Sequence, residues 1–168
     1  GKRRLLSTAV DITLRRQYEE ELRVSQQRLE LAQKSASAGV WDWDMVTQEL
    51  VWSREMFVIL GLDPVTSEAS FPVWRQALHP EDGEVAEKRI TDAIAQRTTL
   101  RSEYRIIRPD GRVRWVNALG DTTYDPDGKP LRMIGIMFDI TKQREMETSV
   151  REARDLFETI LSSLADAV

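Results

Sequence analysis

Cysteine is absent from this chain of 168 residues, and histidine occurs once. Without cysteine there is no disulfide framework, no thiolate metal site and no cysteine nucleophile. Glycine and proline are also scarce, with 8 and 6 residues, while hydrophobic residues make up 41% and charged residues 31%. That composition is typical of a globular protein and excludes a disordered or fibrous chain.

Long apolar runs are missing as well. No run approaches the roughly 20 residues that a membrane-spanning helix needs, and no signal peptide opens the sequence. We therefore expect a cytoplasmic segment with no direct membrane contact of its own, although a longer parent chain could carry spans elsewhere.

An excess of positive charge is lacking too. The 24 basic and 28 acidic residues give a net charge of −4. A phosphate-binding surface needs concentrated positive charge, so we do not expect nucleic acid as a main partner. The length suffices for one ordinary domain plus extra helix, hardly for two domains.

The sequence does contain a repeat at an offset of 128 residues. Asp11-Ile12-Thr13 recurs as Asp139-Ile140-Thr141, and an apolar stripe with the same steps of four and three residues follows each copy. The first stripe is Tyr18, Leu22, Ser25, Leu29, Ala32 and Ala36, and the second is Met146, Val150, Ala153, Phe157, Ile160 and Leu164. Such spacing places each stripe along one face of a helix, so two copies of one helix bracket a single domain.

The repeat predicts the organisation of the chain. Residues 1–12 are expected to end a preceding module, with its last strand over Arg4–Val10. Residues 13–38 are a connector helix, 39–141 the domain, 142–164 a second connector helix, and 165–168 the start of a following module.

The stripes have two interpretations. Each helix could pack on its own domain, or form a short parallel coiled coil in a homodimer. A helix of ~25 residues is about 38 Å long, more than a small domain needs for itself. We therefore predict a dimer interface built from Tyr18, Leu22, Ser25, Leu29 and Ala32.

Between the helices the pattern changes to alternation. Strands are expected at Val40–Asp44 and Leu50–Trp52, then short helices, then three strands joined by two Asp-Gly turns. The short helices are Arg54–Leu60, capped by Ser53 and Gly61, then Phe71–Leu78, and a longer one that Pro80 opens and that ends near Ile94. The last three strands are Leu100–Arg108, Arg112–Tyr124 and Leu131–Asp139. This order predicts an α+β domain with a five-stranded antiparallel sheet and short helices on one face.

The domain resembles the PAS family, in particular a tryptophan-rich subgroup with a C-terminal PAC motif. The matching segments are Gly39–Asp44, Trp52-Ser53, Leu60-Gly61, His79–Asp82, Glu103–Arg105, Asp110–Val116 and Gly135–Thr141. They span about 100 residues in the family's order. The resemblance implies a PAS fold in a multi-domain signalling protein, such as a sensor histidine kinase of a two-component system or a cyclic-dinucleotide enzyme. Adjacent PAS and output domains of the same chain would be its partners.

The resemblance also raises the question of a cofactor. A light-dependent flavin–cysteine adduct is excluded because the chain has no cysteine. His79 lies before Pro80 in a motif that the family shows generally at a helix entry, so we do not expect haem. Non-covalent FAD stays open, because some PAS proteins with tryptophan in the first strand hold it.

A cavity on one face of the sheet is the expected ligand site. Trp41 and Trp43 share a face of their strand by the two-residue period, where they could stack on a flavin or fill its place. Matching the strands to flavin-binding relatives adds Tyr104, Ile106, Val116, Ala118 and Met137. Met137 stands where those relatives place a glutamine, and a thioether is a weak acceptor and no donor. An unknown small apolar or aromatic ligand, or a packed core, fits better.

No catalytic set is present. Asp42 and Asp44 lie on a strand without a third ligand, so we expect no metal site, and no glycine-rich phosphate loop occurs. We expect no enzyme activity in this segment.

Three functions remain. The first is a sensory or relay module that couples ligand binding or dimer rearrangement to an output domain through Asp139, Ile140 and Thr141. The second is an FAD-binding redox sensor. The third is a ligand-free dimerisation spacer.

Overall fold

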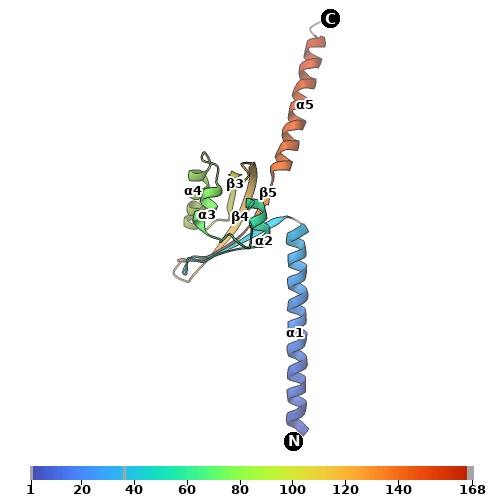
Figure 1. Cartoon of the computed structure of the whole chain (residues 1–168), viewed down its shortest axis with the longest axis vertical. Coiled ribbons are helices and arrows are strands. Elements are labelled where there is room, and N and C mark those ends of the chain that lie inside the picture. Colours follow the sequence, from blue (N-terminus) through green and yellow to red (C-terminus); the bar gives the residue numbers. More distant parts are fainter. Residues whose placement is uncertain (1, 36, 166–168) are drawn as a thin grey trace. The chain divides into compact units, whose positions relative to one another are not determined.

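The computed structural model describes the backbone of residues 2–35 and 37–165, and the surroundings of the side chains at 12–28, 31 and 37–160. Residues 166–168 of the predicted following module lie outside this part. The chain divides into two compact units, Gly1–Ser37 and Ala38–Val168. The first contains helix α1, and the second contains the domain and helix α5 (Figure 1).

Helix α1 extends from Lys2 to Ser35, a length of 34 residues. The strand predicted for Arg4–Val10 is therefore wrong. Four of its seven residues are arginine, leucine or alanine, which are strong helix formers. A helix also satisfies its backbone hydrogen bonds within the segment, whereas a strand requires a neighbouring strand. That residues 1–12 and 165–168 belong to neighbouring modules stays a prediction.

The domain is built on a five-stranded antiparallel sheet in the order β2-β1-β5-β4-β3, which confirms the predicted α+β fold. The strands are β1 (Ala38–Asp44), β2 (Leu50–Trp52), β3 (Leu100–Ile107), β4 (Val113–Tyr124) and β5 (Pro130–Asp139). Both Asp-Gly turns are present: Asp110 Oδ1 accepts from the Arg112 N–H at 2.9 Å, and Asp125 Oδ1 accepts from the Lys129 N–H at 2.8 Å. Strand β1 pairs with β5, so the entrance and the exit of the domain are neighbours in the sheet.

Four helices complete this unit: α2 (Arg54–Leu60), α3 (Phe71–Ala77), α4 (Gly83–Gln96) and α5 (Thr141–Ala165). Helix α2 begins and ends as predicted, with the Ser53 hydroxyl accepting from the Met56 N–H and Gly61 in the left-handed conformation at the end. It packs against β1 and β5, and α4 packs against β3.

Helix α4 begins later than predicted. Pro80 is not its first residue, because the N–H groups of Asp82 and Gly83 both bond to the His79 carbonyl in a turn that precedes the helix. The Asp82 carboxylate does not cap α4. It accepts instead from the backbone N–H of Arg105 at 2.8 Å and from its Nε at 2.9 Å. A contact with β3 thus replaces the cap and shifts the helix start to Gly83.

Candidate functional site

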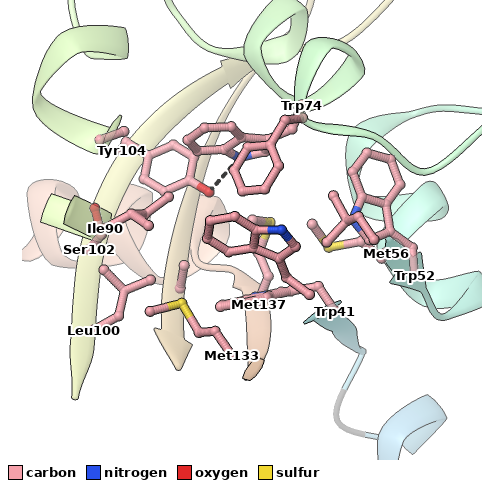
Figure 2. Close-up of a pocket in the computed structure, with 15 residues that line it drawn as sticks. Trp41, Trp52, Met56, Trp74, Ile90, Leu100, Ser102, Tyr104, Met133 and Met137 are labelled. Carbon is pink, nitrogen blue, oxygen red and sulfur yellow. Dashed lines mark hydrogen bonds between the residues drawn. The ribbon is translucent and has the colours of Figure 1, made fainter. Parts of the chain in front are cut away.

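The sheet face under helices α2, α3 and α4 contains a small cavity (Figure 2). Every strand and each of these three helices contributes to its wall. Its lining residues are Trp41, Trp43, Leu50, Trp52, Met56, Phe71, Trp74, Ala86, Ile90, Leu100, Ser102, Tyr104, Ala118, Met133 and Met137. None of them carries a charge, and six are aromatic, so the wall is apolar in character.

Trp41 lies flat on the sheet inside this cavity. A Cβ added to Gly120 would stand 2.6 Å from its Cη2, and a Cβ added to Gly135 would stand 2.1 Å from its Cζ2. Real Cβ atoms do not approach that closely, so the indole can lie here only because β4 and β5 carry glycine at these two positions. The ring therefore occupies part of the space that a planar ligand would take.

Aromatic rings continue from Trp43 across the cavity wall in edge-to-face pairs. Ring centroids are 4.5 Å apart for Trp43 and Phe71, 5.9 Å for Phe71 and Trp74, and 6.1 Å for Trp74 and Tyr104. This is a favourable geometry for aromatic pairs. Trp74 Nε1 also donates a hydrogen bond to the Tyr104 hydroxyl at 3.0 Å. The arrangement holds α3 against β1 and β3.

Five of the seven predicted cavity residues lie in this wall: Trp41, Trp43, Tyr104, Ala118 and Met137. Ile106 and Val116 face the same side of the sheet and are fully buried in the core, but they do not line the cavity. Whether a ligand binds there stays a prediction. Leu100, Ser102 and Met133 also line the cavity and were not predicted. Each lies on the cavity face by the two-residue period of its predicted strand.

The cavity is small, and binding of FAD in it stays a prediction. It encloses about 40 Å³, whereas roughly 10–15 Å³ already holds a single water molecule. The Trp41 indole already lies over β4 and β5 in this wall, and the Met137 thioether offers no hydrogen-bond donor to a ring. His79 is separate from the cavity wall, which leaves no imidazole there for a haem iron.

A cluster of His79, Glu81 and Asp82 brings three potential ligand atoms within 4.8 Å of one another. Both carboxylates are already engaged by Arg105, at 2.8 Å for Glu81 and 2.5 Å for Asp82. The cluster is therefore an ion-pair network that holds the turn before α4 against β3.

Asp42 and Asp44 each accept hydrogen bonds from groups of their own. Arg132 donates two hydrogen bonds to Asp42, at 2.6 and 2.5 Å. Asp44 accepts from the backbone of Val46 and Thr47, and these two bonds hold the pKa of Asp44 below its usual value.

The predicted junction of Asp139, Ile140 and Thr141 is a hydrogen-bonded corner between β5 and α5. The Thr141 hydroxyl accepts from the Trp115 N–H at 2.9 Å, and the Ile140 N–H donates to the Trp115 carbonyl at 2.9 Å. Asp139 Oδ1 accepts from the Thr141 N–H at 2.9 Å. The first residue of α5 is thus fixed to β4.

Arg144 strengthens this attachment from the first turn of α5. Its guanidinium lies over the Trp115 ring at 4.0 Å from the centroid and pairs with Glu103 of β3. Arg105 lies near the same ring, at 5.6 Å. Trp115 is therefore the point on the outer face of the sheet where α5 is held.

The predicted dimer residues lie on α1. Tyr18 and Leu22 are 68% and 61% exposed, and Ser25 is exposed. The side chains of Leu29 and Ala32 lie outside the described residues.

Comparisons with known proteins agree with this fold. A family model described as "PAS fold" matches residues 49–137. The chain is 28% identical over 142 residues to Probable diguanylate cyclase DgcE of Escherichia coli, which is 84% of this chain and 13% of that relative. It is also 28% identical over 153 residues to Blue-light-activated histidine kinase of Brucella anthropi, 84% of this chain and 30% of that relative.

Among solved structures, a sensory box histidine kinase/response regulator from Burkholderia thailandensis superposes with a TM-score of 0.66 at 27% identity. The match covers 79% of this chain and 98% of that one. The chain spans less than a third of the length of the two curated relatives. In the part of the chain that the structure describes, no helix has the length and apolar character needed to cross a bilayer.

Proposed function

Because the chain belongs to the PAS fold family, we propose that it is the sensory module of a longer signalling protein, in which the occupancy of the cavity controls helix α5. The module itself carries out no catalysis. The output domain would be a histidine kinase or a cyclic-dinucleotide enzyme in the same chain, and a cytoplasmic location stays a prediction.

The course of β5 is the observation that supports this proposal. Met133 and Met137 line the cavity and are 0% and 1% exposed. Two residues after Met137 the strand ends at Asp139, and α5 begins at Thr141. A shift of β5 against a ligand therefore acts directly on the first turn of α5.

Helix α2 reaches the same corner by a second route. Met56 of α2 lines the cavity, and the carbonyl of Ile59 accepts a hydrogen bond from Arg108 Nε at 2.8 Å. Arg108 also pairs with Asp139 at 3.7 Å. Movement on the helical side of the cavity and movement of β5 would thus converge on Asp139.

The exposed face of α5 supports a homodimer as the carrier of the signal. Met146, Val150 and Phe157 are 61%, 71% and 62% exposed and share one face by their spacing. A second copy of the chain, paired through this face and the corresponding face of α1, would cover them. Rotation of α5 would then reach the next domain because residues on a packed face move together.

The two alternatives have less support. An FAD-binding redox sensor requires a cavity that accepts a flavin, whereas this one has a volume of about 40 Å³ and has methionine at position 137. A ligand-free spacer accounts for the helices but gives the cavity no role.

Insertions into α5 of the full-length protein test the proposal. One residue inserted after Glu147 turns everything that follows by about 100°, whereas seven residues change the phase by only ~20°. We expect the single insertion to alter basal output strongly, and the seven-residue insertion to preserve regulation. If insertions of one, four and seven residues gave the same output, α5 would be a tether and the spacer function would be favoured.

A further inference from the structure

Helix α5 has a shallow hollow on its surface, close to the corner where it leaves β5. The residues that line this hollow are Lys142, Gln143, Met146, Glu147 and Val150. Four of them, at positions 143, 146, 147 and 150, have the spacing i, i+3, i+4 and i+7, which places them in a diamond on one face of the helix. In a coiled coil, such a diamond is the hole into which a side chain of the facing helix inserts.

The hollow lies on a face of α5 that is turned away from the domain of the same chain. Arg144 attaches the helix to that domain through Trp115 and Glu103. Since Arg144 lies two residues before Met146, their side chains point about 160° apart around the helix, at ~100° per residue. Met146 is 61% exposed and Val150 is 71% exposed. Within the described residues, the domain therefore leaves the hollow uncovered.

The apolar stripe of α5 fits the heptad pattern of a two-stranded coiled coil, in which positions a and d face the partner helix. Its steps of four and three residues alternate between these two positions. The d positions are Met146, Ala153 and Ile160, and the a positions are Val150, Phe157 and Leu164. The hollow around Met146 is thus the first complete hole along the stripe.

Charged and polar residues around the hollow distinguish one arrangement of two helices. The heptad places Lys142 at g, Gln143 at a and Glu147 at e. In parallel helices in register, a g residue lies beside the e residue five positions later in the other helix, so Lys142 of each copy would meet Glu147 of the other. Both side chains are exposed, and Lys142 forms no ion pair within the part of the chain that the structure describes. A polar residue at one a position, such as Gln143, favours the register that places it beside its own copy.

We propose that the face of α5 around this hollow binds the same face of a second copy of the chain, in parallel and in register, and that Lys142, Gln143 and Glu147 select this partner. Met146 of each copy fills the hollow of the other, and two identical Lys142–Glu147 pairs flank the contact. This inference rests on the proposed function, because it gives the orientation of the dimer proposed there and the residues that select it. Its tests measure assembly alone, so they do not depend on relay to an output domain.

Charge reversal in the 168-residue chain tests the selection. Lys142→Glu places two acidic residues opposite each other in the dimer, and Glu147→Lys places two basic ones. By sedimentation equilibrium, each variant alone should dimerise about tenfold more weakly, because two attractive pairs per dimer become repulsive. An equimolar mixture of the two variants should recover the wild-type affinity, since the heterodimer again pairs opposite charges. The weakening should disappear in about 1 M sodium chloride, which screens exposed charges.

Glu145→Lys is the matched control for these variants. It makes the same charge change as Glu147→Lys, but position c of the heptad points away from the partner helix. It should leave the affinity of the dimer within about twofold. The selection is wrong if Glu145→Lys weakens the dimer as much as Glu147→Lys does, or if the mixture is as weak as either variant alone.

The absence of cysteine allows the orientation to be tested by cross-linking. Met146→Cys and Ile160→Cys change two exposed d positions. Each variant should form a disulfide between two copies upon mild oxidation, because parallel helices in register bring both pairs of sulfurs within bonding distance. An antiparallel pair can bring together at most one of the two.

Thr148→Cys is the control for the cross-linking, because position f lies on the opposite face of α5, and it should remain a monomer on a non-reducing gel. The proposal is overturned if either Met146→Cys or Ile160→Cys fails to cross-link with itself, or if Thr148→Cys cross-links as readily. The insertion series in the full-length protein measures output instead, so the two sets of experiments can fail independently.

Discussion

Gly120 and Gly135 are residues at which one methyl group decides whether Trp41 can remain in place. A Cβ on Gly120 would approach the Trp41 ring closely, and the nearest other atom would be the Ile134 oxygen at 3.4 Å. A Cβ on Gly135 would in addition stand 2.4 Å from the Leu119 carbonyl oxygen. The first conflict is with a side chain and the second is partly with backbone.

A double-mutant cycle separates the two cases. Gly120→Ala should lower the free energy of unfolding by about 1–3 kcal/mol in the wild-type background, and by much less in a Trp41→Leu background. Gly135→Ala should be costly in both. Urea denaturation followed by far-ultraviolet circular dichroism measures these values. Gly83→Ala, where a Cβ meets no atom within 4 Å, is the control. Equal costs of Gly120→Ala in both backgrounds would contradict the placement of Trp41.

Because of Asp82, we expect the free energy of unfolding to change with pH in the acid range. Hydrogen bonds from Arg105 lower the pKa of Asp82 to about 2, whereas an unfolded aspartate titrates near ~3.9. Because the folded pKa is the lower one, the stabilisation is complete above about pH 4 and is lost as the pH falls towards 2.

The free energy of unfolding measured between pH 5 and 2 tests this dependence. Asp82→Asn should reduce the decline by up to about 2 kcal/mol. Asp63→Asn is a suitable control, because Asp63 is exposed and its carboxylate accepts only from the Val65 N–H. A decline in Asp82→Asn as steep as in the wild type would exclude Asp82 as the source.

At the scale of elements, the attachment of α5 depends on the Thr141 hydroxyl. In Thr141→Val the partly buried Trp115 N–H loses its acceptor, so the first turn of α5 should open more often. Amide hydrogen exchange over 142–147 should become about tenfold faster, while β4 and β5 keep their protection. Ser149→Ala is the control, because that hydroxyl bonds only to the Glu145 carbonyl of its own helix. Unchanged exchange in Thr141→Val would show that this bond does not hold the helix.

The elements also show which features local sequence can specify. The alternation of Leu100, Ser102 and Tyr104 and the Asp-Gly turns made β3, β4 and β5 predictable, because those signals act within a few residues. Trp74 and Met56 could not be assigned to the cavity, since their direction depends on how two seven-residue helices pack on the sheet. The start of α4 was predicted wrongly for a similar reason. The Asp82 carboxylate bonds to Arg105, 23 residues away in the sequence, instead of capping the helix. The arginine, leucine and alanine residues before Asp11 favour a helix. A strand was predicted there because the repeat matched this segment to the end of the domain.

At the scale of the whole molecule, dimerisation is the property to test. Leu22→Asp places a charge in the exposed stripe of α1 and should convert a dimer to a monomer by light scattering, with the circular dichroism of the sheet retained. Gln27→Asp adds the same charge on the opposite face of α1 and should leave the mass unchanged. If Leu22→Asp kept the mass of a dimer, α1 would not be the main interface.

The positions of the tryptophans allow intrinsic fluorescence to report on two separate parts of the molecule. The chain has five tryptophans; Trp41, Trp43, Trp52 and Trp74 line the cavity, and Trp115 lies under Arg144 at the start of α5. Intrinsic fluorescence therefore has one source at the cavity and another at the corner where the helix begins. Replacing Trp115 with phenylalanine would leave emission from the cavity alone, and the difference spectrum would report the corner. Both ends of the proposed route can thus be followed in real time without an added dye.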